Sequence, residues 1–308
     1  MKAVLIAIAA CSILSVQSAQ ADYQPVAEKV VDNVYAIVGP TDQRSPDNDG
    51  LNANYGFIVT AQGVIMIDAG ASRLGAEKLT AAIGKVTRQP VRWLVDTGSQ
   101  DHRWLGKDYF ASHGAEIIAM KRTAPTQADN AHQEMESMNR FLGDQMKGTK
   151  PMPASHSLDG NDATIELGGE KLVLHYTNAH FPGDAWVWLP AHNTVFTGDQ
   201  VFVDRILGVL PPSNVRNGQR AFHELEALNP AHIVPGHGSV CDLAKAKRDT
   251  GDYYDFLVDK IAPAAHDMED MEAVLDRYAD LPAFRHLGNY DSMHRANMNR
   301  AYTEFISE

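Results

Sequence analysis

Short apolar runs separated by polar turns recur through the first half of the chain, and they predict strands rather than long helices. Several runs are rich in Val and Ile, and the turn Ala61-Gln62-Gly63 joins two of them as a hairpin. A different pattern, with Leu74, Leu79 and Ile83 at helical spacing, predicts a helix over 73–86. We expect the strands of this half at 33–38, 55–60, 64–67, 91–95 and 116–120.

The second half repeats this organisation. Strands are expected at 164–167, 171–176, 185–189, 194–197 and 232–234. Further helices are expected at 106–113, 124–146 and 218–227, and mostly helix from 243 to 308, with a loop at 151–162. Two halves that each combine several strands with flanking helices favour an α/β sandwich built around two mixed sheets. No clean linker separates the halves, so they are expected to form one domain with a helical appendage.

The first 21 residues have the pattern of a secretory signal peptide: one Lys, a short apolar run and the ending Ala19-Gln20-Ala21. Cleavage after Ala21 would place the protein in the periplasm or outside the cell. A lipid anchor at Cys11, in the run Ile8-Ala9-Ala10-Cys11, is the less favoured alternative. The expected divisions are therefore 1–21 as signal peptide, 22–245 as the main domain and 246–308 as a C-terminal helical extension.

Composition narrows the class of partner. The chain has 308 residues, 44% of them hydrophobic, and a formal net charge of −12. Such an acidic protein is a poor partner for nucleic acid or an anionic membrane surface, and the leading apolar run is too short and too interrupted for a membrane span. After cleavage Cys241 would be the sole cysteine, and an internal disulfide would then be impossible. Cys241 itself is most simply interpreted as a small buried residue.

Four short polar motifs each follow an apolar, β-branched run, and each is therefore expected in a loop at a strand end. Loops carried on a rigid sheet are where ligands and catalytic groups collect. Together the motifs supply three imidazoles and the carboxylates of Asp101 and Asp199, with Asp184 at the end of the second motif. They are Thr97-Gly98-Ser99-Gln100-Asp101-His102, Asn178-Ala179-His180-Phe181-Pro182-Gly183-Asp184, Thr197-Gly198-Asp199 and Val234-Pro235-Gly236-His237-Gly238.

In their order and spacing these motifs resemble the metallo-β-lactamase fold superfamily, over about residues 33–240. The resemblance implies a four-layer αββα sandwich and two neighbouring metal positions. Carried over by position, His180 matches a ligand of the first metal, and Asp101, His102 and His237 match the ligands of the second. Asp199 matches a carboxylate that bridges the two metals.

The sequence departs from this family at its opening motif, His-x-His-x-Asp-His, because only the final Asp101-His102 is present. The positions of the missing pair fall on Thr97 and Ser99, or on Gly98 and Gln100 if the alignment carries a deletion. Neither choice supplies an imidazole. We therefore expect one metal per chain, held by Asp101, His102, Asp199 and His237. Zinc is the first expectation, although iron or manganese would suit the same ligands.

A single zinc can generate hydroxide near neutral pH and polarise a carbonyl. The resemblance then implies that His180, Asp101 or Asp199 accepts the proton of the water. Ser99, Gln100 and Asp184 are candidates for hydrogen bonds that orient ligands. Arg103 and Trp104, which follow the motif directly, either line the substrate cleft or pack at the surface. Asp68, in Ile67-Asp68-Ala69-Gly70, is interpreted as structural.

The leading hypothesis is a secreted metal-dependent hydrolase of a small molecule, with metal-bound hydroxide attacking the acyl carbon of a β-lactam, thioester, lactone or ester. Loss of two histidines motivates an alternative, a catalytically inactive binding protein of the same fold in the periplasm. A non-haem iron oxygenase is the weakest hypothesis, since the family's persulfide-oxidising members hold iron with the absent histidine pair.

Overall fold

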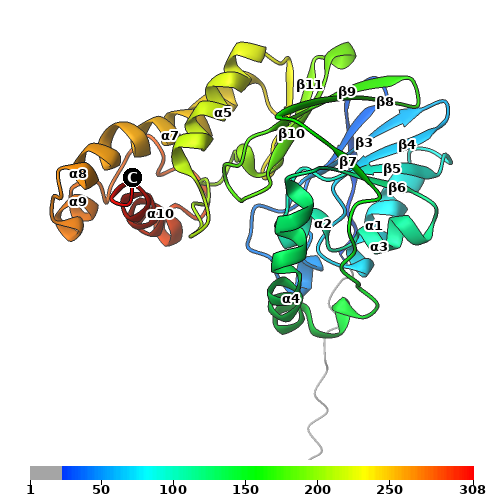
Figure 1. Ribbon diagram of the computed structural model, residues 1–308, viewed down its shortest axis with the longest axis horizontal. Coiled ribbons are helices and arrows are strands. Elements are labelled where there is room, and N and C mark those ends of the chain that lie inside the picture. The colour runs from blue at the N-terminus through cyan, green and yellow to red at the C-terminus, as the bar shows by residue number, and fades with distance from the viewer. Residues whose placement is uncertain (1–22) are drawn as a thin grey trace, which may run out of the picture.

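The computed structural model describes residues 23–308 and shows four layers, with two central sheets packed face to face and helices on both outer sides (Figure 1). This is the αββα arrangement expected from the sequence. The signal peptide at 1–21 and the alternative anchor at Cys11 lie outside the described residues. Among residues 23–308, no helix is long and apolar enough to cross a membrane.

The first sheet has seven strands in sequence order, because each strand pairs with the one before it. Antiparallel pairing joins β1 to β4, and parallel pairing joins β4 to β7. The parallel half needs crossover connections, which helices supply. The strands are β1 (Ala27–Val31), β2 (Val34–Ile37), β3 (Tyr55–Thr60), β4 (Gly63–Ile67), β5 (Val91–Val95), β6 (Glu116–Met120) and β7 (His156–Leu158).

The second sheet has five strands in the order β12-β11-β10-β9-β8. All its pairs are antiparallel except β11 with β12. That parallel pair places the chain after β11 and the chain after β12 at the same edge of the sheet. The strands are β8 (Asp162–Leu167), β9 (Glu170–Tyr176), β10 (Ala185–Leu189), β11 (Thr194–Phe196) and β12 (His232–Val234).

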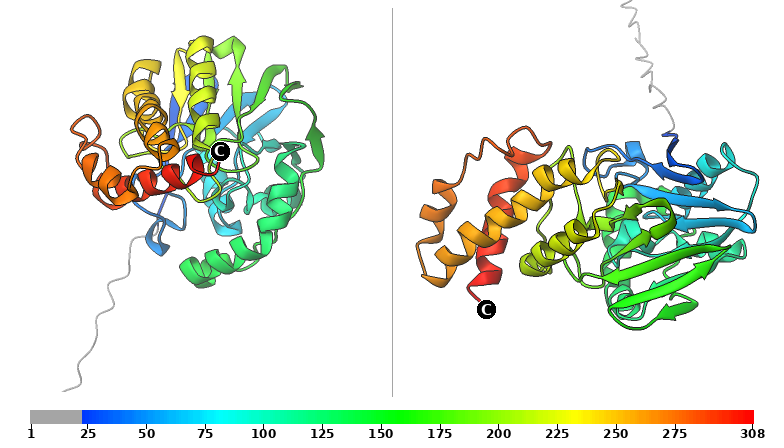
Figure 2. Two further views of the ribbon diagram at one scale, coloured as in Figure 1. Left: turned by 60° about the vertical axis from the view of Figure 1, so that its left-hand side comes forward. Right: turned by 90° about the horizontal axis from the view of Figure 1, so that it is seen from above.

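Helices cover both outer faces, and α4 runs beside the sandwich (Figures 1 and 2). Helix α1 is capped at its N-terminus by Ser72, whose side chain accepts a hydrogen bond from the Gly75 backbone N–H, and α5 is capped in the same way by Asn214. The helices up to β12 are α1 (Arg73–Gly84), α2 (Asp101–Trp104), α3 (Lys107–Ser112), α4 (Thr123–Leu142) and α5 (Val215–Leu228).

After β12 the chain is helical and gathers at one end of the molecule next to α5 (Figure 1). A continuous helical run from Leu243 to His266 contains two π-helical segments, Lys247–Gly251 and Leu257–Ile261. The α-helical parts of this region are α6 (Leu243–Ala246), α7 (Asp252–Phe256), α8 (Ala262–His266), α9 (Met271–Arg277) and α10 (Tyr290–Phe305).

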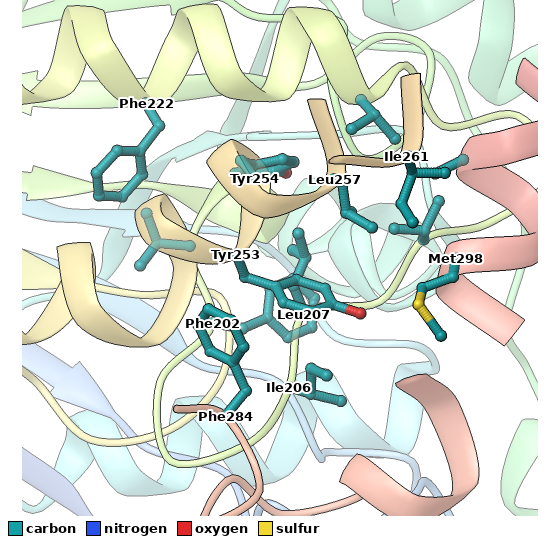
Figure 3. Packing of buried hydrophobic residues seen from close by; sticks show 14 of the residues in the cluster. Phe202, Ile206, Leu207, Phe222, Tyr253, Tyr254, Leu257, Ile261, Phe284 and Met298 are labelled. Carbon is teal, nitrogen blue, oxygen red and sulfur yellow. The ribbon is translucent and has the colours of Figure 1, made fainter. Parts of the chain in front are cut away.

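Separate hydrophobic clusters fill the spaces between the layers. One lies between the two sheets and includes Ile65, Val95 and Val187. Another joins the first sheet to α1 and α3. The largest group packs the outer side of the second sheet and the loop after β11 against the C-terminal helices, with Phe202, Tyr253 and Met298 among its members (Figure 3). The C-terminal helices therefore share a core with the sandwich.

Most expected strands form within one or two residues of their predicted limits, but β1 and β7 were not expected. Strand β7 lies inside the predicted loop 151–162, where Pro, Ser and Gly outnumber apolar residues. It has three residues and lies at the edge of its sheet, paired only with β6. Tertiary pairing rather than local propensity produces such a strand.

Burial raises the pKa of Cys241 to about 12, so its thiol is protonated at neutral pH.

Candidate metal centre

Three predicted ligands converge where the two sheets meet. His102, Asp199 and His237 are all buried, and each offers a ligand atom within 4.8 Å of the other two. The Nε2 atom of His102 lies 3.0 Å from one carboxylate oxygen of Asp199, and the Nε2 atom of His237 lies 3.3 Å from the other. They come from α2, from the 3-10 turn Gly198–Gln200 after β11, and from the loop after β12.

The orientation of His237 is set by a backbone partner. Its Nδ1 atom lies 2.9 Å from the carbonyl oxygen of Asn52, so Nδ1 carries the proton and donates it. Burial lowers the pKa of His237 to about 3, with Asp199 acting in the opposite direction, so the ring is neutral at neutral pH. The lone pair on Nε2 therefore faces the Asp199 carboxylate. Two electron-rich atoms held face to face suit a shared cation.

Asp199 is ionised despite its burial. Burial alone would raise its pKa, but the charge of Arg103 and the His102 ring hold that pKa well below the usual range. The Arg103 guanidinium binds both carboxylate oxygens, with Nε 3.1 Å from Oδ2 and Nη2 2.5 Å from Oδ1. Because each carboxylate oxygen has two lone pairs, Asp199 keeps acceptor capacity for a further partner.

Arg103 connects the two sheets through five hydrogen bonds and is 1% exposed. Besides Asp199 it donates to Asp68 and to the backbone carbonyls of Asn54 and Gly236. Asp68 in turn accepts hydrogen bonds from the backbone N–H and the hydroxyl of Thr97, both at 2.7 Å. Arg103 thus fixes the position of the Asp199 carboxylate. Asp68, which follows β4, links the end of that strand to the end of β5 through Thr97.

The donor set fits a zinc ion. Two imidazoles and one carboxylate are ligand types that zinc prefers in catalytic sites, where three protein ligands leave one position open. The Nδ1–H of His237 is fixed by a backbone carbonyl, as is usual for metal-ligating histidines. No second set of three such groups converges elsewhere in residues 23–308.

Asp101 is not part of this convergence. Its carboxylate lies 2.5 Å from Nη1 of Arg44 and 3.1 Å from Nδ1 of His102. Burial would raise the pKa of Asp101, but the charge of Arg44 together with His102 holds that pKa well below its usual value. In this arrangement Asp101 orients the His102 ring, so that Nε2 points to Asp199. In this structure Asp101 therefore lies behind His102 and does not join the convergence of His102, Asp199 and His237.

His180 lies close to the convergence but faces a different partner. Its Nδ1 is 2.8 Å from the carbonyl oxygen of Gly208, and its Nε2 is 3.2 Å from Oε1 of Gln100. Burial lowers the pKa of His180 to about 4, so the ring is neutral and Nε2 can accept a proton. The Phe202 ring contacts both His180 and His237, with centroids 5.3 and 4.6 Å apart.

Ser99 and Asp184 stabilise the loop that carries His180. The Ser99 hydroxyl donates to the Pro182 carbonyl, and Asp184 accepts a 2.6 Å hydrogen bond from the Phe181 backbone N–H. Burial, reinforced by the charge of Asp199, raises the pKa of Asp184 well above its usual value. Gly98 lies against Asp184, since a Cβ there would come within 2.8 Å of its carboxylate oxygen. The motif Thr97–His102 and the motif Asn178–Asp184 therefore contact each other at Gly98 and Ser99, among the positions that align with the missing histidine pair.

A cavity of about 630 Å³ opens beside Gln100 and Asp101. One wall is the polar face of α4, and the other is the apolar loop ends around Phe181 and Leu210. Such a mixed lining is typical of a small-molecule site. The lining residues are Gln100, Asp101, Thr126, Asp129, Asn130, Gln133, Glu134, Ser137, Phe181, Pro182, Leu210, Pro211 and Pro212.

Glu134 lies at the buried side of this cavity and accepts a 2.9 Å hydrogen bond from the indole Nε1–H of Trp104. Burial, together with the Asp101 charge, raises the pKa of Glu134 to about 8. Between about pH 5 and pH 8 the folded protein therefore holds a proton that the unfolded chain has released. Stability should fall as the pH rises through this window.

We expect Glu134→Gln to flatten that dependence, because glutamine keeps the acceptor for Trp104 and cannot ionise. The free energy of unfolding of the wild type should fall more steeply from pH 6 to pH 8 than that of the variant, by about 1 kcal/mol per pH unit. Urea unfolding at pH 6, 7 and 8 measures this, with Glu136→Gln on the exposed face of α4 as control. Parallel profiles for Glu134→Gln and the wild type would show that Glu134 is ionised throughout.

The loop from Val203 to Leu210 depends on the C-terminal helices. Buried Asn297 of α10 donates to the carbonyl of Leu207 at 2.6 Å and accepts from the N–H of Val209 at 2.9 Å. These two bonds flank Gly208, whose carbonyl binds His180. A residue outside the predicted motifs thereby fixes the partner of a predicted site residue.

Asn297→Ala should therefore make the backbone around Gly208, which binds His180, more mobile. It should also lower the free energy of unfolding. Losing two buried hydrogen bonds is expected to cost about 1–3 kcal/mol. Amide hydrogen exchange at Val209 should accelerate more than exchange in β4, whereas Asn299→Ala, in an exposed position of the same helix, should change neither. Equal acceleration at both places would mean that Asn297 acts only on global stability.

Sequence reasoning missed Arg44, Glu134 and Asn297. Glu134 had a detectable signal, because it shares a helical stripe with the buried residues Met138 and Leu142. An acidic residue on a buried stripe needs a partner or a proton. Arg44 lies in a polar loop and Asn297 in a helix of mixed pattern, so neither position stands out from local sequence.

The fold and this site together define the class of the protein. Two face-to-face sheets are flanked by helices, and buried histidine and aspartate side chains converge in the loops at their edge, in an αββα fold. A model of the family described as "Metallo-beta-lactamase superfamily" matches residues 48–237. The chain belongs to this superfamily, as a divergent member without the His-x-His pair.

Relatives and solved structures agree with this assignment. The chain is 25% identical to metallo-beta-lactamase IND-1 of Chryseobacterium indologenes, over 60% of this chain and 72% of the relative. Identity to metallo-beta-lactamase type 2 of Elizabethkingia meningoseptica is also 25%, over 68% and 77%. The fold is similar to a metallo-beta-lactamase from Pontibacter korlensis, at 21% identity and a TM-score of 0.60, covering 75% of this chain and 99% of the other.

One structural neighbour extends further along the chain. The sec-alkylsulfatase Pisa1 from Pseudomonas sp. superposes with a TM-score of 0.71 at 13% identity. The match covers 92% of this chain and 50% of that one. The family model matches only residues 48–237, and a superposition over 92% of the chain has to extend beyond residue 237. The shared fold therefore includes part of the C-terminal helical region.

Proposed function

We propose that the protein is an exported hydrolase that uses one metal ion, first of all zinc, held by His102, Asp199 and His237. The observation that carries this proposal is the convergence of those three buried side chains within 4.8 Å. A zinc ion bound there would supply a Lewis acid and a water molecule with a pKa near neutrality. The leader-like pattern of residues 1–21 supports export.

The chain's own residues account for the remaining requirements of hydrolysis. Asp101 orients the His102 ring, and Arg103 holds Asp199 through both carboxylate oxygens. His180 is neutral, and its Nε2 atom is positioned to accept a proton and return it to a leaving group. The cavity beside Gln100 and Asp101 offers an apolar wall for an acyl group and a polar wall for its substituents.

Substrate class follows from the acyl chemistry that such a site supports. We propose an acyl substrate, namely a β-lactam, thioester, lactone or ester. The names of the relatives, both metallo-beta-lactamases, support including a β-lactam among the first compounds tested. The sec-alkylsulfatase neighbour supports including an alkyl sulfate as a comparison.

The test is the metal content of the purified mature protein, combined with turnover of a panel containing one compound of each class. About one zinc per chain is expected, with metal and turnover both lost in His102→Ala and in His237→Ala. His113→Ala, an exposed histidine outside the site, is the control and should keep both. Two metals per chain would contradict the single-metal proposal.

A second candidate function is a binding protein of the same fold without turnover. The observation favouring it is that Arg103 already supplies a positive charge to both oxygens of Asp199. A metal-free protein that binds small molecules but turns over none of the panel would establish this alternative and overturn the hydrolase.

A further inference from the structure

A second cavity, of about 370 Å³, lies at the start of the loop that carries His180. It has no lining residue in common with the cavity beside Gln100 and Asp101. The end of β9, the first half of α5 and the residues just before α4 and β8 form its walls. Every lining side chain carries a polar group, which predicts a polar ligand. The lining residues are Arg122, Asn161, His175, Tyr176, Thr177, Asn178, Asn217, Arg220 and Glu224.

The hydroxyl of Thr177 has no partner in this cavity wall. Thr177 is 1% exposed, and its Oγ1 atom has no hydrogen-bond partner within residues 23–308. The backbone N–H of Thr177 donates to the Asp184 carbonyl at 2.9 Å, so the residue is fixed in place. A buried hydroxyl without a partner costs free energy. In a residue that lines a cavity, such a hydroxyl indicates a partner that arrives from outside the chain.

The guanidinium of Arg122 is held at the cavity wall without a counter-charge. It donates to the neutral amide oxygen of Asn161 at 2.8 Å and lies 5.0 Å from the centre of the Tyr176 ring. Within residues 23–308, no carboxylate lies at ion-pair distance from it. Since a guanidinium has five N–H donors, Arg122 keeps donors for an anion.

The carboxylates near this cavity are already engaged by groups of the chain. One oxygen of Glu224 lies 2.9 Å from Nε2 of His175, and the other lies 3.8 Å from Nε of Arg220. The Nδ1 atom of His175 lies 2.6 Å from Asp162. Glu224 therefore faces His175 and Arg220, and Arg122 is the cation that a ligand can neutralise.

We propose that this cavity binds a small hydroxyl-rich molecule that carries a carboxylate or phosphate group, with the anion at Arg122 and an oxygen of the ligand at Thr177. The planar guanidinium suits either oxyanion because it can donate two parallel hydrogen bonds. The cavity is larger than an inorganic oxyanion requires, and the amides of Asn161 and Asn217 can bind hydroxyls. This site is independent of the proposed hydrolase function, because none of its lining residues belongs to the convergence of His102, Asp199 and His237.

The experiment is isothermal titration of the full mature protein with sodium gluconate and with glucose 6-phosphate. Glucose and inorganic phosphate, which each carry one half of the expected chemistry, are titrated for comparison. At least one of the first two compounds should bind saturably, with a dissociation constant lower by roughly tenfold or more than that of either half. The tighter of the two identifies the anionic group. Absence of saturable binding by both, or equal affinity for inorganic phosphate, would overturn the proposal.

Thr177→Val tests the role of the hydroxyl, because valine keeps the shape and removes the oxygen. The dissociation constant should rise roughly tenfold. The melting temperature of the ligand-free protein should stay the same or rise, because the variant buries no unpaired hydroxyl. A lower melting temperature would mean that the hydroxyl is already satisfied, and would contradict the proposal.

Two further substitutions locate the ligand. Arg122→Gln should weaken binding of the anionic compounds roughly tenfold, whereas Arg140→Gln, at an exposed arginine near the other end of α4, should leave it unchanged. His237→Ala should also leave the dissociation constant unchanged. Binding that depends on His237 but not on Thr177 or Arg122 would place the ligand at the candidate metal centre and overturn the proposal. Metal content and turnover do not enter these readouts, so failure of the hydrolase proposal would be recognised separately.

Discussion

Arg103→Met should lower the free energy of unfolding by about 3–5 kcal/mol at pH 7, because it leaves two buried carboxylates without their cation. Asp199 would lose both of its guanidinium hydrogen bonds, and Asp68 would lose its ion pair. The backbone carbonyls of Asn54 and Gly236 would lose a donor as well. Methionine fills most of the volume, so the loss reports charge and hydrogen bonding rather than a cavity.

The pH dependence of this loss has a definite sign. Burial raises the pKa of Asp68 to about 6 even with Arg103 beside it. Without Arg103 that pKa rises further, so above about pH 6 the folded variant holds a proton that the folded wild type and the unfolded chain have both released. The stability of the variant should therefore recover towards the wild type as the pH falls from 7 to 5.

Urea unfolding of wild type and Arg103→Met at pH 7 and pH 5 measures both effects. Arg88→Met, at an exposed position after α1, is the control and should change stability by less than about 0.5 kcal/mol. If Arg103→Met were as stable as the control at pH 7, the buried carboxylates would have another source of positive charge.

Gly238→Ala should cost about 3–5 kcal/mol and should also disturb His237, its direct neighbour. Gly238 has φ +90°, a conformation that L side chains rarely adopt, and a Cβ there would lie 1.9 Å from the carbonyl oxygen of Val203. That carbonyl belongs to backbone, so no side-chain rotation relieves the overlap. Backbone strain of about 1–3 kcal/mol adds to an overpacking cost of similar size.

Gly169→Ala separates the two contributions. Gly169 has almost the same φ, +89°, but nothing lies within 4 Å of a Cβ at that position. Its substitution should cost only the strain, about 1–3 kcal/mol. Thermal and urea unfolding of both variants give the comparison, and zinc affinity should fall in Gly238→Ala alone. Equal losses in the two variants would mean that the loop containing Val203 moves aside freely.

The sequence was informative wherever a residue's role depends on its own strand. Short apolar runs predicted β3 and β5 because buried strands have a strong local pattern, and the motif containing His237 fell in the loop after β12 as expected. The sequence also placed Asp199 and His237 in loops at strand ends. Their convergence with His102 follows from the pairing of β11 with β12 and from the packing of two sheets.

Side-chain direction could not be predicted in the same way. The resemblance assigned Asp101 as a ligand, but the structure turns it towards Arg44, which lies 57 positions earlier in a polar loop. The contribution of Asn297 comes from a helix more than 80 residues beyond Leu207. Contacts over such separations leave no periodic signal, so a single sequence carries no trace of them.

The core shared by the sandwich and the C-terminal helices has a consequence for how the molecule unfolds. Phe202 and Leu207 pack in one continuous cluster with residues such as Leu257 and Met298. Neither side of that cluster can lose its partner without exposing apolar surface to water. We therefore expect a single cooperative transition in which the loops carrying Asp199 and His237 unfold together with the helical extension. A protein shortened at residue 245 is expected to be partly unfolded and prone to aggregation.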